Sequence, residues 1–175
     1  MSKHAEHHST AATSKRPWRL TWIGGAIGLV AVLGITVAVF AGRSAEAARQ
    51  SVIDVYKDPA CGCCSLWVEH LREHGYTVST TDTRDLAALK MRNGVPREMQ
   101  SCHTALVDGY VIEGHVPAAD VQRLLSDRPA IAGLAVAGMP IGSPGMEVEG
   151  VPSQPYDVMA FEDGGGAFVF ASHGN

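Results

Sequence analysis

The sequence predicts a mixed α/β domain of order β-α-β-α-β-β-α behind one membrane-spanning segment. Three observations support this prediction. Short β-branched runs alternate with segments of helical periodicity after residue 50, an uncharged apolar run of membrane-spanning length precedes them, and three cysteines follow the first predicted strand. A length of 175 residues leaves room for one ordinary domain and an appendage.

Composition argues against two classes of protein. A hydrophobic fraction of 46% and a charged fraction of 18% are incompatible with a chain disordered throughout. The net charge of −4 argues against a nucleic-acid-binding protein, which would carry a basic surplus. That charge is unevenly distributed, because Met1–Arg43 holds five basic residues against one acidic residue, a net of +4, and the remainder therefore carries −8.

The apolar run is Trp22–Ala41, which contains no charged residue. A helix rising about 1.5 Å per residue crosses the hydrocarbon layer in about 20 residues, and Trp18 and Trp22 lie where interfacial aromatics are expected. The positive-inside rule places the basic tail in the cytoplasm and everything after Arg43 outside. Ala45-Glu46-Ala47 has the form of a signal-peptidase site, so cleavage is the alternative, although the length of the run favours a retained anchor.

The expected organisation is therefore a cytoplasmic basic tail, a transmembrane anchor or signal segment, a linker, a folded domain and a C-terminal tail, at residues 1–21, 22–41, 42–50, 51–171 and 172–175. The predicted location is the periplasm, either anchored to the inner membrane by the N-terminal helix or released after signal cleavage.

The first half of the domain alternates strands and helices. Residues 52–56 are short, β-branched and apolar, which predicts a strand. Residues 65–74 have helical spacing and are followed by Gly75, a C-terminal stop. Residues 76–80 predict a second strand. A second helix is expected to be capped by Asp82 or Thr83 and to end at Asn93-Gly94.

The second half begins with a predicted hairpin, 104–107 and 110–113, joined by an Asp-Gly turn. A third helix is expected over 118–126, with Pro117 at its start. Ten of the 27 residues in Pro129–Pro155 are glycine or proline, which predicts loop. Residues 156–161 and 167–170 predict a closing pair of short strands.

The cysteines lie where the first strand meets the first helix. Cys61 and Cys64 have the C-x-x-C spacing of thioredoxin-like proteins, in the βαβ context that this motif requires. A helix N-terminus favours the thiolate form of cysteine. Cys63 adds a third sulfur, which departs from a simple dithiol and instead suits Cu(I) or Zn(II).

A second cluster, Cys102-His103, directly precedes the third predicted strand. In a thioredoxin-like fold this position faces the C-x-x-C loop, so we expect Cys102 and His103 to approach Cys61–Cys64. The cluster has only one cysteine, which excludes a zinc ribbon with two C-x-x-C halves.

Several other side chains are candidates from the sequence. His115 is either a surface or capping histidine or a residue at the rim of the same site. Met139 and Met146, in the Gly/Pro-rich loop, are either packing residues or thioether ligands of Cu(I).

Two helical features have simpler explanations. His70 and His74 are spaced i, i+4, which can chelate metal, but a solvated face is favoured. Trp67 is expected to pack beneath the cysteine loop.

A family resemblance rests on several of these strings. They are YKDPACGCCSLWVEH at 56–70, GVP at 94–96, SCHTALVDGYVIEGHVP at 101–117, RLL at 123–125 and GMPIGSPGMEVEG at 138–150. Together they resemble the bacterial CopG-type copper-resistance metalloproteins, long grouped as a domain of unknown function, over about residues 52–170. Ala137 stands where proline is expected before GMP, and the membrane segment lies outside the match.

The resemblance implies a thioredoxin-like fold, a periplasmic location and a thiolate-rich copper site. It implies that Cys61, Cys63, Cys64 and Cys102 are ligands, joined by His103 or His115. It further implies a role in copper or silver resistance beside efflux systems and copper oxidases of the envelope.

Three functions follow as hypotheses. The first is an envelope copper-binding protein that holds Cu(I), as a mononuclear or multinuclear site, and couples it to redox chemistry. The second is a thiol–disulfide oxidoreductase in which Cys61 attacks a partner disulfide and Cys64 resolves the intermediate, these two being its catalytic residues. The third is a structural module held together by zinc.

Overall fold

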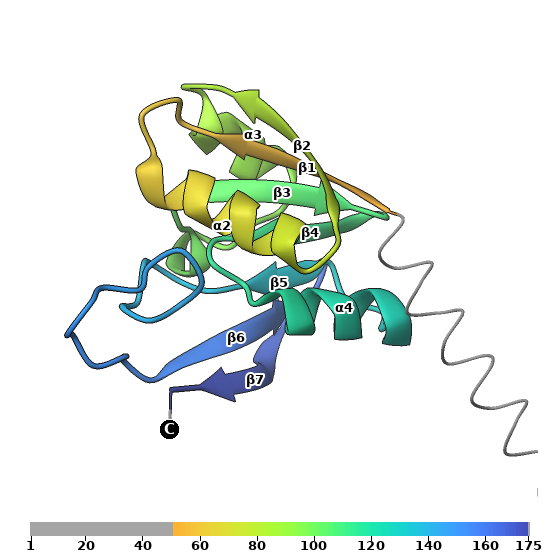
Figure 1. The fold of residues 1–175 in the computed structure, drawn as a ribbon. Helices are drawn as coiled ribbons and strands as arrows, with labels where there is room; N and C mark the ends of the chain where they lie inside the picture. Colours follow the sequence, from red (N-terminus) through yellow and green to blue (C-terminus); the bar gives the residue numbers. More distant parts are fainter. Residues whose placement is uncertain (1–50, 175) are drawn as a thin grey trace, which may run out of the picture. The chain divides into compact units, whose positions relative to one another are not determined.

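The computed structural model describes residues 51–174 (Figure 1). The predicted cytoplasmic tail, membrane segment and linker lie outside these residues. Within the described part of the chain, no helix is both long enough and apolar enough to cross a membrane.

The first βαβ unit comprises β1 (Val52–Lys57), α2 (Gly62–Glu73) and β2 (Thr77–Asp82), and β2 pairs with β1 in parallel. Helix α2 begins at Gly62, earlier than the periodicity of 65–74 indicates, because Cys61 caps it: the Cys61 sulfur accepts a hydrogen bond from the Cys64 backbone N–H at 3.4 Å. The first turn of the helix therefore carries Cys63 and Cys64.

The predicted start of the next helix is wrong. Helix α3 spans Leu86–Arg92, and its N-cap is Asp85 rather than Asp82 or Thr83. Asp82 instead ends β2, paired in register with Lys57 and ion-paired with the Lys57 ammonium at 3.0 Å. Strand pairing and this ion pair hold Asp82 extended, so the turn into the helix comes later.

A short 3-10 helix, η1 (Arg97–Met99), leads into the predicted hairpin of β3 (His103–Val107) and β4 (Tyr110–Glu113). Asp108 and Gly109 form the two-residue turn with φ values of 49° and 88°. Both values are positive, as the predicted Asp-Gly hairpin turn requires, so the hairpin prediction is confirmed.

After α4 (Ala118–Asp127) the chain forms β5 (Gly133–Ala135), β6 (Tyr156–Phe161) and β7 (Ala167–His173). Strand β5 lies in the segment predicted to be loop, because three residues inside a Gly/Pro-rich segment show no periodicity. The strand forms because β4 pairs with it in parallel and β6 pairs with it antiparallel. Strand β7 also continues to His173, beyond the predicted end at residue 170.

All seven strands form one sheet of order β2-β1-β3-β4-β5-β6-β7, in which β3 runs antiparallel to β1 and β4. Helices α2 and α4 cover one face and α3 lies on the other (Figure 1). The main apolar core lies under α2 and α4, and a smaller cluster that includes Val95, Met99 and Phe161 lies on the opposite face. Successive strand residues point to opposite faces, so Ile112 faces the main core and Val111 faces the smaller cluster.

Candidate metal centre

Three of the cysteines lie at the start of α2, with Cys61 as its N-cap and Cys63 and Cys64 in its first turn. Cys61 and Cys64 are joined by a disulfide bond, and Cys63 is a free thiol. The Cys63 sulfur lies 3.5 Å from the Cys61 sulfur. The predicted dithiol pair is therefore geometrically competent to form a disulfide, with a third sulfur in contact with it.

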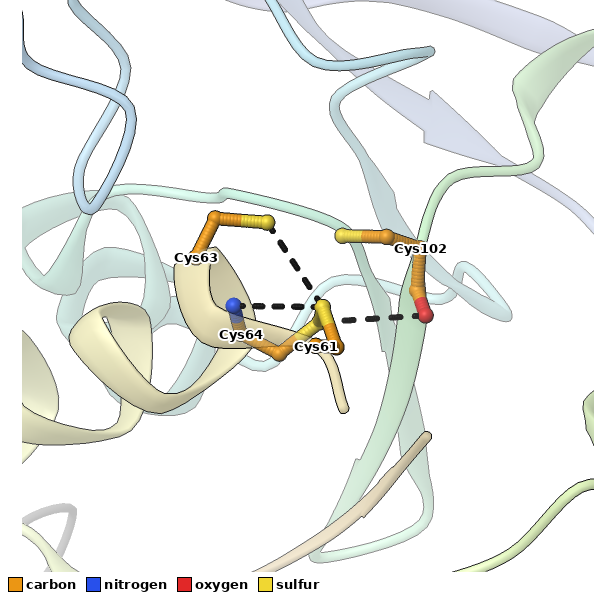
Figure 2. A group of neighbouring side chains, drawn as sticks. All are labelled: Cys61, Cys63, Cys64 and Cys102. Carbon is orange, nitrogen blue, oxygen red and sulfur yellow. Dashed lines mark hydrogen bonds between the residues drawn. A yellow bond between two sulfur atoms is a disulfide. The ribbon is translucent and has the colours of Figure 1, made fainter. Parts of the chain in front are cut away.

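The fourth cysteine reaches this turn through the pairing of β1 with β3. Lys57 at the end of β1 lies opposite His103 at the start of β3, so the residue before β3 lies close to the segment that follows β1. The Cys64 sulfur lies 3.9 Å from the Cys102 carbonyl oxygen. Figure 2 shows the Cys63 and Cys102 sulfurs pointing toward each other.

We call Cys61, Cys63, Cys64 and Cys102 the four-sulfur group, because their sulfur atoms all lie within 4.8 Å of one another. Thiolates at such separations can share one soft cation or bridge several, once the disulfide is reduced. The expectation that Cys102 approaches the C-x-x-C turn is met by this geometry.

A second group of donors shares Cys102. The Cys102 sulfur lies 3.2 Å from His103 Nδ1 and 3.1 Å from His115 Nε2. One ligand atom from each of these three residues lies within 4.8 Å of the others, and we call them the mixed group. His115 is fully buried, which decides between the two alternatives that the sequence left open: it lies against Cys102 rather than on the surface.

The two histidines are held in states that leave a nitrogen lone pair available. His115 Nδ1 donates to the Pro144 carbonyl at 2.8 Å, so Nε2 of the neutral ring carries a lone pair directed toward Cys102. Burial lowers the pKa of His115, and burial together with His115 and Lys90 lowers the pKa of His103 well below its ordinary value. Neutral imidazole is the form that binds metals.

His103 has a buried nitrogen without a partner. Its Nε2 atom is buried and has no hydrogen-bond partner among the described residues, whereas Nδ1 contacts the Cys102 sulfur. Buried polar atoms are normally satisfied, and an unsatisfied imidazole nitrogen beside a thiol fits a donor set that a cation completes.

The pKa of Cys102 is raised to about 11, chiefly because the thiol is buried and secondarily because Cys63 lies beside it. Without a metal, Cys102 is therefore a neutral thiol at pH 7. A cation that binds its sulfur as thiolate has to displace a proton.

Trp67 packs behind the site, as the sequence predicts. It is fully buried on α2, its indole N–H donates to the Val116 carbonyl at 2.9 Å, and its ring lies 4.4 Å from the His103 ring. The indole therefore braces His103 against the core.

The Gly/Pro-rich loop closes a third side of the site. The Ser101 hydroxyl donates to the Gly138 carbonyl, and Pro144 accepts from His115. Met139, between these two anchors, is exposed, and Met146, two residues beyond Pro144, is half-buried. Their role as thioether ligands stays a prediction.

Gly145 allows this loop to approach α2. Its φ is +82°, and a Cβ at this position would lie 2.7 Å from the Trp67 backbone nitrogen and 2.9 Å from the Cys63 carbonyl oxygen. A side chain here would therefore push the loop away from the cysteine turn.

Gly145→Ala should lower the free energy of unfolding by about 1–3 kcal/mol, from backbone strain and overpacking. Gly62→Ala is the matched control beside the same cysteines, because a Cβ at Gly62 meets nothing within 4 Å; we expect a change of less than about 1 kcal/mol there. Urea denaturation of the two variants measures the difference. Equal stability of both would contradict the packing described for the loop.

The i, i+4 histidines form no metal site within residues 51–174. His70 Nε2 accepts from the Ala118 backbone N–H at 3.1 Å, and His74 Nδ1 donates to the His70 carbonyl at 2.7 Å. Neither belongs to a group of metal-binding side chains in this range. His74 is exposed, whereas His70 is half-buried, so the solvated face expected for the pair holds for His74 alone.

Sequence reasoning missed a buried ion pair behind the site. Lys90 on α3 contacts the Glu113 carboxylate on β4 at 2.5 Å, and both side chains are almost completely buried. The Lys90 ammonium also donates to the Thr104 hydroxyl at 2.9 Å. In the sequence, the pair is indicated only by the glutamate that ends the otherwise apolar strand YVIE. That glutamate by itself does not identify Lys90 as its partner.

One protein family and two solved structures are similar to this chain. The family described as "Protein of unknown function, DUF411" matches residues 99–146, and no curated protein matches the chain. Two solved structures, described as copper resistance protein copG, forms 2 and 1, match with TM-scores of 0.68 and 0.67. Each is 44% identical and covers 71% of this chain, and 98% of each is covered in return. By this identity and coverage, the chain belongs to the CopG-type copper-resistance family.

Proposed function

We propose that the protein binds Cu(I) in the cell envelope as part of copper or silver resistance. The observation that carries the proposal is the four-sulfur group, in which four cysteine sulfurs from two separate segments lie within 4.8 Å of one another. Thiolate donors select Cu(I), and they bridge readily, so the site accommodates one or several copper ions. The copper-resistance function named for the two similar structures supports the same assignment.

The two donor groups differ in chemistry. The four-sulfur group is soft and suits Cu(I), whereas the mixed group combines one sulfur with two imidazole nitrogens, which suit Cu(I), Cu(II) and zinc. Cys102 belongs to both groups. Cys102 would therefore hold bound copper between all-sulfur and nitrogen-containing donors, and a donor set that suits both Cu(I) and Cu(II) would suit redox chemistry of the bound copper.

A thioredoxin-like fold and an envelope location belong to the same proposal. The fold is supported by the β1-α2-β2 unit with C-x-x-C at the start of its helix. The periplasmic location, the membrane anchor at 22–41 and association with copper efflux or copper oxidase proteins follow from the sequence and from the family resemblance.

Anaerobic titration of the reduced protein with Cu(I) tests the proposal. We expect the four-cysteine-to-serine variant to lose tight binding, because hydroxyls are poor ligands for a soft cation. Competition with a Cu(I)-specific chelator measures the affinity. Equal affinity in the variant and the parent protein would refute copper binding by the cysteines, and bound zinc that Cu(I) fails to displace would instead indicate a zinc-stabilised structural module.

Copper binding should release protons. The raised pKa of Cys102, about 11, means that its thiol carries a proton at pH 7, so apparent Cu(I) affinity should rise with pH, about tenfold per unit for each proton displaced. Titration in weak buffer with an indicator dye measures the release. Cys102→Ser should reduce it by one proton per protein, and an unchanged count would contradict binding through this thiol.

A second candidate function is thiol–disulfide exchange. The Cys61–Cys64 disulfide supports it, whereas the Cys63 sulfur, 3.5 Å from Cys61, departs from a simple two-thiol site. In that case reduced Cys61 attacks a partner disulfide, and Cys64 then displaces the partner's second thiol and re-forms the Cys61–Cys64 bond. Reduction of insulin by the metal-free protein distinguishes the two functions, since rapid turnover without copper would favour the oxidoreductase.

A further inference from the structure

The Glu113 carboxylate contacts both sides of the Cys102-His103 segment. One oxygen accepts from the Ser101 backbone N–H at 2.6 Å, and the other accepts from the Thr104 hydroxyl at 2.7 Å. Ser101 directly precedes Cys102 and Thr104 directly follows His103. One fully buried side chain therefore fixes the backbone before and after two of the proposed ligands.

These contacts lie on the opposite side of the sheet from the cysteine helix. Thr104 and Glu113 are directly paired on β3 and β4, and they point away from the main core, which Ala105 and Ile112 face. Glu113 therefore acts through the backbone rather than on the sulfurs. The next residue, Gly114, donates its backbone N–H to the His103 carbonyl at 3.1 Å. His115 follows directly, so the segment after Glu113 contacts one proposed ligand and carries another.

Lys90 compensates the buried charge. Its ammonium contacts Glu113 at 2.5 Å and Thr104 at 2.9 Å. A buried ion pair gives little net stability compared with apolar residues of similar volume. Net stability alone therefore does not account for this ion pair, which lies directly behind a ligand segment.

We propose that Glu113 is a positioning residue of the metal centre. It holds the Cys102-His103 segment at the distance from Cys63 that the four-sulfur group requires, with Lys90 as its charge partner. This inference rests on the proposed copper function. Hydrogen-bond partners behind metal ligands typically change metal affinity by 10–100-fold when removed.

Two double variants distinguish the effect of the Glu113 hydrogen bonds on Cu(I) binding from the effects of the buried charges and of protein stability. Lys90→Met/Glu113→Gln removes both charges but keeps an amide that can accept from Ser101 and donate to Thr104. Lys90→Met/Glu113→Leu removes the charges and these hydrogen bonds at similar volume. We expect the first to bind Cu(I) within about threefold of the parent chain and the second to bind about 10–100-fold more weakly.

A metal-free measurement tests the geometry directly. In the full-length chain with Cys61→Ser and Cys64→Ser, Cys63 and Cys102 are the two remaining cysteines. Their disulfide equilibrium with oxidised and reduced glutathione reports the effective concentration of one thiol at the other. Adding Lys90→Met/Glu113→Leu should lower this equilibrium constant at least about tenfold, whereas Lys90→Met/Glu113→Gln should leave it near its starting value.

The outcomes are separable. A folded Lys90→Met/Glu113→Leu protein with unchanged disulfide equilibrium and copper affinity would overturn the positioning role. If that variant does not fold, Thr104→Val removes one of the two anchoring hydrogen bonds, and an unchanged equilibrium there would overturn it as well. If the parent chain binds no Cu(I), the proposed function fails, but the disulfide equilibrium still decides whether Glu113 positions Cys102.

Discussion

Replacing Cys102 with serine should weaken Cu(I) binding by more than about 100-fold, because a ligand should matter more than the outer hydrogen-bond partners that change affinity by 10–100-fold. Cys102 is common to the four-sulfur group and the mixed group. Its loss leaves the first with three sulfurs and the second with two imidazoles. No other single substitution among the proposed ligands removes a donor from both groups.

Cys63→Ser is the matched comparison, since Cys63 belongs to the four-sulfur group and not to the mixed group. Chelator competition under anaerobic conditions measures the Cu(I) affinity. We expect the parent protein to bind Cu(I) more tightly than Cys63→Ser, and Cys63→Ser to bind it more tightly than Cys102→Ser. Circular dichroism checks that both variants fold. Parent-like affinity in folded Cys102→Ser would refute a shared thiolate at the centre of the site.

Lys90→Met alone should lower the free energy of unfolding by about 3–5 kcal/mol, because it leaves the Glu113 carboxylate buried without its cation. The whole free energy of unfolding of a small domain is only about 5–15 kcal/mol. The variant should therefore unfold at clearly lower urea concentration.

The Lys90→Met/Glu113→Leu double variant provides the control. Apolar residues of similar volume replace a buried ion pair at little cost, so the double variant should recover most of the stability that Lys90→Met loses. Urea denaturation of the parent protein and both variants gives the values. A double variant as unstable as Lys90→Met would show that the loss comes from packing around Lys90 and not from an uncompensated charge.

Much of the fold follows from local sequence. The order β-α-β-α-β-β-α and the closing strand pair were predictable because their residues show strand alternation, helical spacing and an Asp-Gly turn. Helix α3 was predicted to start too early because β2 extends to Asp82. Strand β5 was missed because its three residues become a strand only through pairing with β4 and β6.

The site likewise has features that local sequence predicts and features that depend on contacts between distant residues. The spacing of Cys61, Cys63 and Cys64 predicts a sulfur-rich helix start without any tertiary information. The role of His115 could not be decided from sequence, because it depends on a 3.1 Å contact with Cys102, thirteen residues away along the chain. The Lys90–Glu113 pair joins residues 23 positions apart, and no local pattern links them.

By itself, the sequence determined the order of the strands and helices other than β5 and η1, and the cysteine turn, because each depends on neighbours along the chain. The membrane-spanning character of residues 22–41 stays a prediction. The tertiary structure alone decided that Cys102 belongs to two donor groups, that the loop at Gly145 packs on the cysteine helix, and that Glu113 lies behind the ligand segment. The first and the last of these features depend on the register of β1, β3 and β4. Register brings distant residues within a few ångströms of one another, and long-range pairing and burial set it together.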